Sequence, residues 1–232
     1  MILAMSLRIK GWRSIVKWSI WGLLGVLLLI FLIRVTIFEH NYYSEKEGSE
    51  RAVAVEAEAE QEELVEIEPT TEEKKEYNVA ADRPRYLSIA KIGVEKARIF
   101  PMGVNARGEL ATPSNIFDVG WYDASGKPGQ GGTMIIDGHN GGPHVLGVFK
   151  NLPNLAAGDL IAIERGDGVV FQYSVVENKT VPLAESDSYM KTAAQSPVAG
   201  KESVTLISCT GEWSQQQKTY LSRQFTRAIL VD

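Results

Sequence analysis

Three kinds of side chain in this sequence act together in acyl transfer: a thiol, an imidazole and a guanidinium. They are Cys209, which is the only cysteine, His139, and the arginine pair Arg223 and Arg227. A thiolate is a nucleophile, an imidazole carries protons, and a guanidinium can stabilise a developing oxyanion. If they converge on one spot, they indicate covalent catalysis at a carbonyl group.

Each of these residues also has an ordinary explanation. A lone cysteine is most often a small buried hydrophobic residue. A lone histidine after a strand is more often a loop residue, and arginines on a last strand usually face solvent. The combination favours chemistry, and His139 is the favoured histidine. His144 follows a Gly-Gly-Pro turn, and His40 lies beside an apolar segment described below.

Strands are expected to position all of these residues. The runs 132–140, 204–208 and 220–231 are rich in β-branched and apolar residues, which is typical of strands with a buried face. The pattern predicts that Cys209 lies at the end of its strand, because Thr210-Gly211 follows as a break. A strand end is a rigid place from which to present a side chain.

From residue 85 onward, short apolar runs alternate with glycine, proline and asparagine. Further strands are predicted at 87–90, 94–100, 119–122, 159–163 and 169–176, with an Asp-Gly turn before the last one. A helical turn is predicted at 148–152 and a short helix at 187–195. About eight strands at regular spacing predict an all-β fold, a closed or nearly closed eight-stranded β-barrel.

The charge distribution argues against nucleic-acid binding through a basic surface. The chain has 232 residues and a net charge of −5, with 13 glutamates against four basic residues in the window 45–76. The 156 residues that follow carry 15 charges of each sign, so the predicted barrel is neutral. A single cysteine also excludes an internal disulfide.

The N-terminal part is predicted to anchor the chain in a membrane. A basic segment at 1–17 precedes an apolar run at 18–38, which is about the ~20 residues that a bilayer core requires. A cleaved signal peptide is the alternative, but no small-x-small site follows the run. The positive-inside rule then places the N-terminus in the cytoplasm and the barrel outside the cell. Residues 39–84 are expected to form an acidic, flexible tether.

Several motifs, in their order, resemble the sortase family. They are Arg85–Val94, Val119-Gly120-Trp121-Tyr122, Gly138-His139-Asn140, and Thr205-Leu206-Ile207-Ser208-Cys209 with an arginine on the next strand. The resemblance covers residues 85–232. Ser208 stands where the family usually has threonine, which preserves the hydroxyl. The short loops look more like the compact class E/F sortases than like pilin-specific ones.

The resemblance implies a membrane-anchored cysteine transpeptidase with an eight-stranded sortase barrel, and with neither metal nor cofactor. Its catalytic residues would be His139, Cys209 and an arginine. Arg223 is favoured because of its Tyr-x-x-Arg spacing, while Arg227 precedes a hydrophobic run that some family members share. The implied partners are secreted proteins with an LPXTG-like C-terminal sorting peptide, an amine acceptor (a cell-wall precursor or a pilin lysine), and membrane lipid around the anchor.

Two other classes of function remain open at this point. L,D-transpeptidases and papain-like hydrolases also use an extracytoplasmic cysteine, but their motifs place the cysteine differently from Cys209. A non-enzymatic β-barrel that binds a surface partner would merely bury this thiol. Alkylation in the folded state discriminates between them, because an active-site thiol reacts and a core thiol resists.

Overall fold

The structure, a computed structural model, describes Arg34 and residues 64–105 and 108–231. Apart from Arg34, the predicted membrane anchor at 18–38 lies outside the described residues, and so does the first part of the predicted tether. No helix within the described residues is long and apolar enough to cross a membrane.

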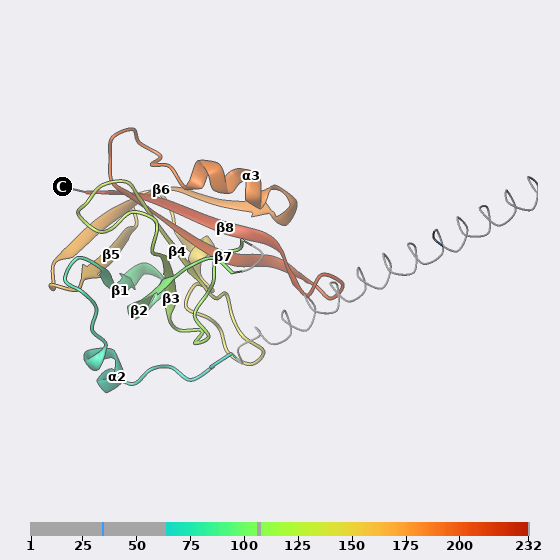
Figure 1. Ribbon diagram of the computed structural model, residues 1–232, viewed down its shortest axis with the longest axis horizontal. Helices are drawn as coiled ribbons and strands as arrows, with labels where there is room; N and C mark the ends of the chain where they lie inside the picture. Colours follow the sequence, from blue (N-terminus) through green and yellow to red (C-terminus); the bar gives the residue numbers. More distant parts are fainter. Residues whose placement is uncertain (1–33, 35–63, 106–107, 232) are drawn as a thin grey trace, which may run out of the picture. The chain divides into compact units, whose positions relative to one another are not determined.

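Within the described residues, eight strands form one closed barrel, in the order β1-β2-β3-β4-β7-β8-β6-β5 (Figure 1). The predicted eight-stranded barrel is therefore confirmed. The strands are β1 (Pro84–Ile89), β2 (Val94–Met102), β3 (Val119–Tyr122), β4 (Thr133–Gly138), β5 (Leu160–Arg165), β6 (Val170–Pro182), β7 (Ser203–Ser214) and β8 (Thr219–Leu230).

The strand order places the three elements that carry the candidate residues side by side. β4 pairs with β7 in parallel, and β7 pairs with β8 as an antiparallel hairpin. Parallel neighbours need a long crossover connection, and here it contains β5, β6 and two helical segments. The segments are the 3₁₀ turn η2 (Leu152–Asn154) and the helix α3 (Leu183–Ala193). The 3₁₀ turn η1 (Ala90–Ile92) joins β1 to β2.

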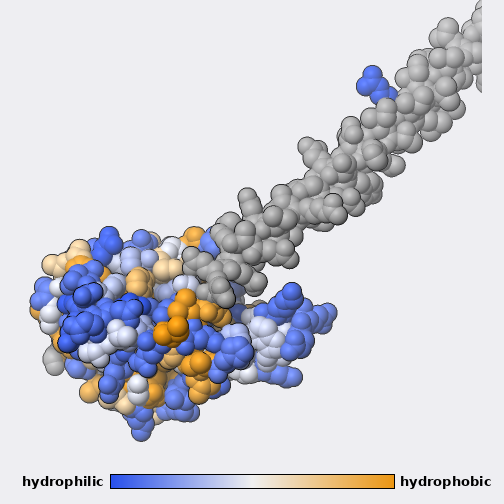
Figure 2. All heavy atoms as spheres, turned by 90° about the horizontal axis from the view of Figure 1, so that it is seen from below, coloured by the Kyte–Doolittle hydropathy of each residue, from blue (hydrophilic) through white to orange (hydrophobic). Residues whose placement is uncertain are grey.

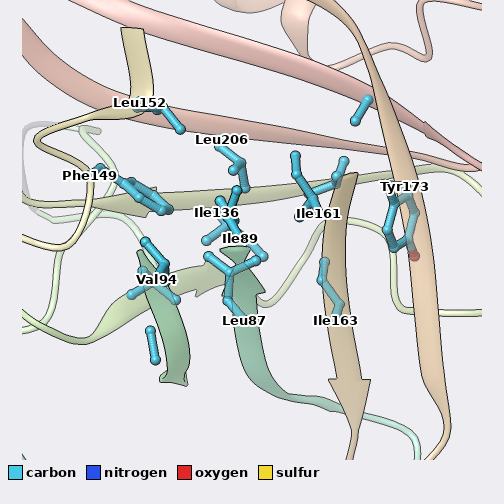
Figure 3. Packing of buried hydrophobic residues seen from close by; sticks show 14 of the residues in the cluster. Leu87, Ile89, Val94, Ile136, Phe149, Leu152, Ile161, Ile163, Tyr173 and Leu206 are labelled. Atoms are coloured by element: carbon cyan, nitrogen blue, oxygen red, sulfur yellow. The ribbon is translucent and has the colours of Figure 1, made fainter. Parts of the chain in front are cut away.

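The barrel interior is filled by one face of each strand. On β4, Met134 and Ile136 point inward and are almost fully buried, as alternation along a strand requires. Ile136 and Leu206 of the neighbouring β7 lie in the same cluster as residues from β1, β5 and β6 (Figure 3). Close packing of these branched side chains holds the backbones of β4 and β7 in a fixed register.

The opposite face of β4, β7 and β8 carries a second apolar cluster. It contains Ile135, Val181, Ala193, Ile207 and Phe225. α3 lies over β6 and β8 and covers part of this cluster (Figure 1). α3 begins at Leu183, four residues before the predicted start at 187. Pro182 is the N-cap residue of this helix, and it lacks the N–H that would otherwise continue the helix towards the N-terminus.

Residues 64–83 pack against the barrel, although the sequence pattern assigned them to the tether. Val65 pairs with the backbone of Ser114 and Ile116, and the Tyr77 hydroxyl donates to the Ile99 carbonyl. Between these contacts lies the short helix α2 (Thr71–Glu76), whose N-terminus is closed by a capping box. Tyr77 also lies 4.8 Å from the Phe100 ring, so a few anchoring contacts order an otherwise polar segment.

The surface has the usual mixture of polar and apolar groups. Figure 2 shows one face of the molecule, on which hydrophilic residues predominate and hydrophobic residues emerge between them. Large apolar side chains that are exposed include Ile67, Val104 and Leu146.

Candidate active site

Cys209 lies within β7 and not at the strand end that the sequence pattern predicted. β7 continues to Ser214, and pairing with β8 is interrupted only between Thr210 and Trp213. Gly211 adopts φ 84°, a left-handed conformation that glycine tolerates, so the chain forms a bulge and then resumes the ladder. The Thr-Gly break in the sequence therefore marks a bulge directly after the cysteine.

Arg223 is the residue directly opposite Cys209. The two are partners in the antiparallel pairing of β7 with β8, so their side chains lie on the same face of the sheet. The guanidinium donates to the carbonyls of Tyr220 (2.9 Å) and Ser222 (3.1 Å) and to the Thr219 hydroxyl (3.2 Å). These contacts hold a positive charge midway along the β7–β8 hairpin, on the residue paired with Cys209.

Arg227 has a different environment. Its register partner is Thr205, four residues away from Cys209 along β7. It is buried, pairs with Glu177 at 2.6 Å, and donates to backbone carbonyls at the end of α3 and just beyond it. Arg227 therefore attaches α3 to the barrel, and Arg223 is the arginine beside Cys209.

The parallel pairing of β4 with β7 brings His139 to Cys209. Their register runs from Thr133↔Ser203 to Asp137↔Ile207 without a shift. It continues in a hydrogen bond of 2.9 Å from the Ser208 hydroxyl to the Gly138 carbonyl. His139 and Cys209 are the next residues on the two chains, and His139 directly follows Gly138, where β4 ends. The Ser208 hydroxyl thus joins the segment that carries Cys209 to the segment that carries His139.

The His139 imidazole is held by a backbone carbonyl. Nε2 lies 2.8 Å from the carbonyl oxygen of Pro113, in the connection between β2 and β3. A carbonyl only accepts, so Nε2 carries a hydrogen, and Nδ1 is the nitrogen left to exchange a proton. Burial lowers the pKa of His139, and the bond to Pro113 opposes this shift.

Cys209 is partly buried, and this controls its ionisation. Burial raises the pKa of the thiol, the positive charge of Arg223 opposes the rise, and Asp137 adds to it. Together with the lowered pKa of His139, this makes a neutral thiol and a neutral imidazole the resting forms near pH 7. The arrangement holds a nucleophile, a proton carrier and a cation on adjacent strands.

The model of the sortase domain family matches residues 87–231. The chain belongs to the sortase family. Sortases are cysteine transpeptidases, so this chain is an enzyme of that type. The family match decides against L,D-transpeptidases, papain-like hydrolases and a purely binding barrel.

Solved structures of sortases resemble this one. A pilus-related sortase C of Group B Streptococcus is 21% identical, with a TM-score of 0.48, and the match covers 75% of this chain and 77% of that one. Clostridium perfringens sortase D5 is 23% identical, with a TM-score of 0.45, and the match covers 71% of this chain and 90% of that one. Sortase A from Corynebacterium diphtheriae is 26% identical, with a TM-score of 0.47, and the match covers 66% of this chain and 63% of that one. A search of curated proteins found no match.

The remaining histidines of this sortase lie elsewhere. His144 follows the Gly-Gly-Pro turn, and its backbone N–H donates to Glu66 at 2.9 Å. His40 lies outside the described residues. Over residues 64–105 and 108–231, no group of three or more His, Cys, Asp and Glu side chains is arranged to hold a metal ion.

Sequence reasoning missed one titratable residue in this sortase, Asp137. It stands on β4 between the apolar Ile136 and Gly138, two residues before His139. Burial raises the pKa of its carboxyl to about 7, although a hydrogen bond from Thr112 opposes the shift. The sequence did contain a signal for this residue, namely a carboxylate within an otherwise apolar strand. Burying such a group without a hydrogen-bond partner costs free energy, so it is seldom found there without a role.

Proposed function

We propose that this sortase cleaves an LPXTG-like C-terminal sorting peptide of secreted proteins and transfers the acyl part to an amine of the cell surface. The observation that carries the proposal is the direct pairing of Cys209 with Arg223, next to the strand that leads to His139. Because Cys209 is the only cysteine in the sequence, no second group of a thiol, a cation and an imidazole can exist in the described residues.

In the first half-reaction the Cys209 thiol transfers its proton to His139, and the thiolate attacks the scissile carbonyl carbon. The carbonyl oxygen becomes an oxyanion, which the guanidinium of Arg223 stabilises. When the C–N bond breaks, the imidazolium returns its proton to the departing amine. The acyl group then remains on sulfur as a thioester.

In the second half-reaction an incoming amine attacks the thioester. His139 accepts the proton that the amine loses, and the C–S bond breaks as the new amide bond forms. The leaving thiolate then takes the proton back and restores the resting thiol. An amine is a better nucleophile than water towards a thioester, which makes transfer the productive outcome.

A peptide-transfer assay tests this function. We expect the full-length chain in detergent to convert a Leu-Pro-x-Thr-Gly peptide and an added amine into the ligated product, seen by mass spectrometry. A panel of peptides and amines would identify the motif and the acceptor. Failure of every peptide to form either a thioester or a product would contradict the proposed substrate class. The compact class E/F subtype remains a prediction, which the preferred peptide would test.

We also propose that residues 18–38 anchor the enzyme in the cell membrane, with residues 1–17 in the cytoplasm and the barrel outside. The basic residues that precede the apolar run support this orientation. We expect protease added to intact, wall-stripped cells to release the barrel by cutting in the Glu-rich segment before residue 64. A cytoplasmic marker protein is the control. Protection of the barrel until the cells are lysed would show the opposite orientation.

A further inference from the structure

Asp137 and His139 lie on the same face of one strand and are both tied to one short piece of the β2–β3 connection. The Thr112 hydroxyl donates to Oδ2 of Asp137 at 2.5 Å. The next residue, Pro113, places its carbonyl 2.8 Å from Nε2 of His139. Two residues of an extended strand span about 6.6 Å, so consecutive residues of the connection bridge the carboxyl and the imidazole.

The neighbouring strand is shaped to admit these groups. Gly120 on β3 pairs with Asp137, and a Cβ at this glycine would lie 2.8 Å from Oδ1 of Asp137 and 3.1 Å from Cδ of Pro113. A contact of 2.8 Å is shorter than real Cβ atoms show. The absence of a side chain at Gly120 therefore leaves room for both the carboxyl and the proline.

Backbone hydrogen bonds hold the connection on both sides of the stretch that contacts His139. Thr112 and Pro113 lie between Ala111, whose N–H donates to the Gly103 carbonyl, and Ser114, whose carbonyl accepts from Val65. Across the 111–114 stretch, two side-chain bonds reach β4 and the residue after it: the Thr112 hydroxyl donates to Asp137, and His139 bonds the Pro113 carbonyl. The Thr112–Asp137 bond is therefore the one of these two that can hold the Pro113 carbonyl in place without His139.

We propose that Asp137 is a positioning residue for transpeptidation, which acts through Thr112 to hold the Pro113 carbonyl on Nε2 of His139. This leaves Nδ1 as the nitrogen that exchanges protons with the thiol and the amines. The inference deepens the proposed function, on which it rests. Asp137 touches neither substrate nor thiol in this role.

Three neighbouring strands place titratable or charged side chains on the face of the sheet that carries Asp137 and His139. β3 contributes Tyr122, β7 contributes Cys209, and β8 contributes Arg223 and Arg227, while Thr112 on the connection does not titrate. Asp137 itself raises the pKa of Cys209, and Arg223 opposes that effect. The pKa of His139 therefore has to be taken from a full titration curve of each variant and of the wild type.

The test uses three substitutions in the full-length chain in detergent. Thr112→Val removes only the hydroxyl, Asp137→Ala removes the acceptor, and Asp137→Asn keeps an acceptor oxygen that cannot ionise. We expect the first two to lower kcat by about 10- to 100-fold, because a small displacement of a catalytic group has effects of this size. KM for the sorting peptide should change little, and Asp137→Asn should recover most of kcat.

The decisive readout is the titration of His139 by NMR, which needs no substrate. Burial is the larger influence on this imidazole, so release of the connection should raise its pKa towards the ordinary value of about 6.5. We expect that rise in Thr112→Val and Asp137→Ala, but not in Asp137→Asn. This measurement remains valid even if no sorting peptide is turned over, so it separates failure of the inference from failure of the proposed function.

Thr133→Val is the matched control. Thr133 lies on the same strand, where its hydroxyl pairs with that of Ser203 at 2.9 Å, away from His139. This variant should lose stability without changing the His139 titration or kcat. If Thr112→Val leaves both the titration and kcat as in the wild type, or changes them only as Thr133→Val does, the proposal is overturned. Thr112→Val decides the outcome even if Asp137→Ala does not fold.

Discussion

Cys209→Ala is expected to lower the rate of peptide transfer by ~10⁴-fold or more, because no other thiol in the chain can form the thioester. The barrel should remain folded. Cys209 is only partly buried, and losing its sulfur removes few contacts, so the cost in the free energy of unfolding should be about 1 kcal/mol. Mass spectrometry of the product and urea denaturation of the same sample measure the two quantities.

Cys209→Ser is the companion variant. It nearly preserves the side-chain volume and replaces the thiol with a hydroxyl that is a far weaker nucleophile without further activation. Both variants should therefore be inactive, and neither should trap an acyl-enzyme with the peptide. A Cys209→Ala protein that still ligates peptide to amine at a substantial rate would contradict the thioester mechanism.

Arg223→Lys is expected to cost about 2–4 kcal/mol of transition-state stabilisation, or roughly 30- to 1000-fold in kcat/KM. Lysine keeps the positive charge beside Cys209 but loses the planar fork of donors. It also loses the set of contacts with Tyr220, Ser222 and Thr219 that orients the guanidinium. Steady-state kinetics with the sorting peptide measure the change, and the thermal midpoint reports on folding.

Arg227→Lys is the matched comparison, since it lies on the same strand and the same face. Its guanidinium bonds Glu177 and the carbonyls of Thr192 and Gln195, and lysine cannot make all of these contacts. We expect a loss of about 1–3 kcal/mol in the free energy of unfolding, with kcat/KM close to the wild type. If Arg227→Lys cripples acylation while Arg223→Lys does not, the assignment of the arginine is wrong.

Local pattern and residue type were enough to predict the barrel and the residues at its candidate site. Alternation of β-branched and apolar residues is a property of each strand by itself, so the runs around Ile136 and Leu206 identified β4 and β7. Rare side chains on such strands, Cys209 and His139, stood out because acyl transfer needs those chemical groups. The roles of these residues in catalysis remain predictions that the variants above test.

Several features depended on contacts between distant parts of the chain. Thr210-Gly211 indicates a strand end when viewed alone, but β8 lies alongside and continues the ladder past the bulge. Residues 64–83 appear too polar to fold, yet Tyr77 and Val65 attach them to a surface that only the assembled barrel provides.

Strand propensity and alternation act over a few neighbouring residues. For this reason the residue pattern alone predicted a β-barrel with one thiol, and placed His139 and both arginines on or beside strands. Alternation did not distinguish Arg223 from Arg227, since residues four apart on a strand share a face, and only the Tyr-x-x-Arg spacing favoured Arg223. The register of the folded hairpin places Arg223, and not Arg227, opposite Cys209. The tertiary structure also brought Thr112 to Asp137 across 25 residues, a pairing that depends on where a loop closes over the folded sheet.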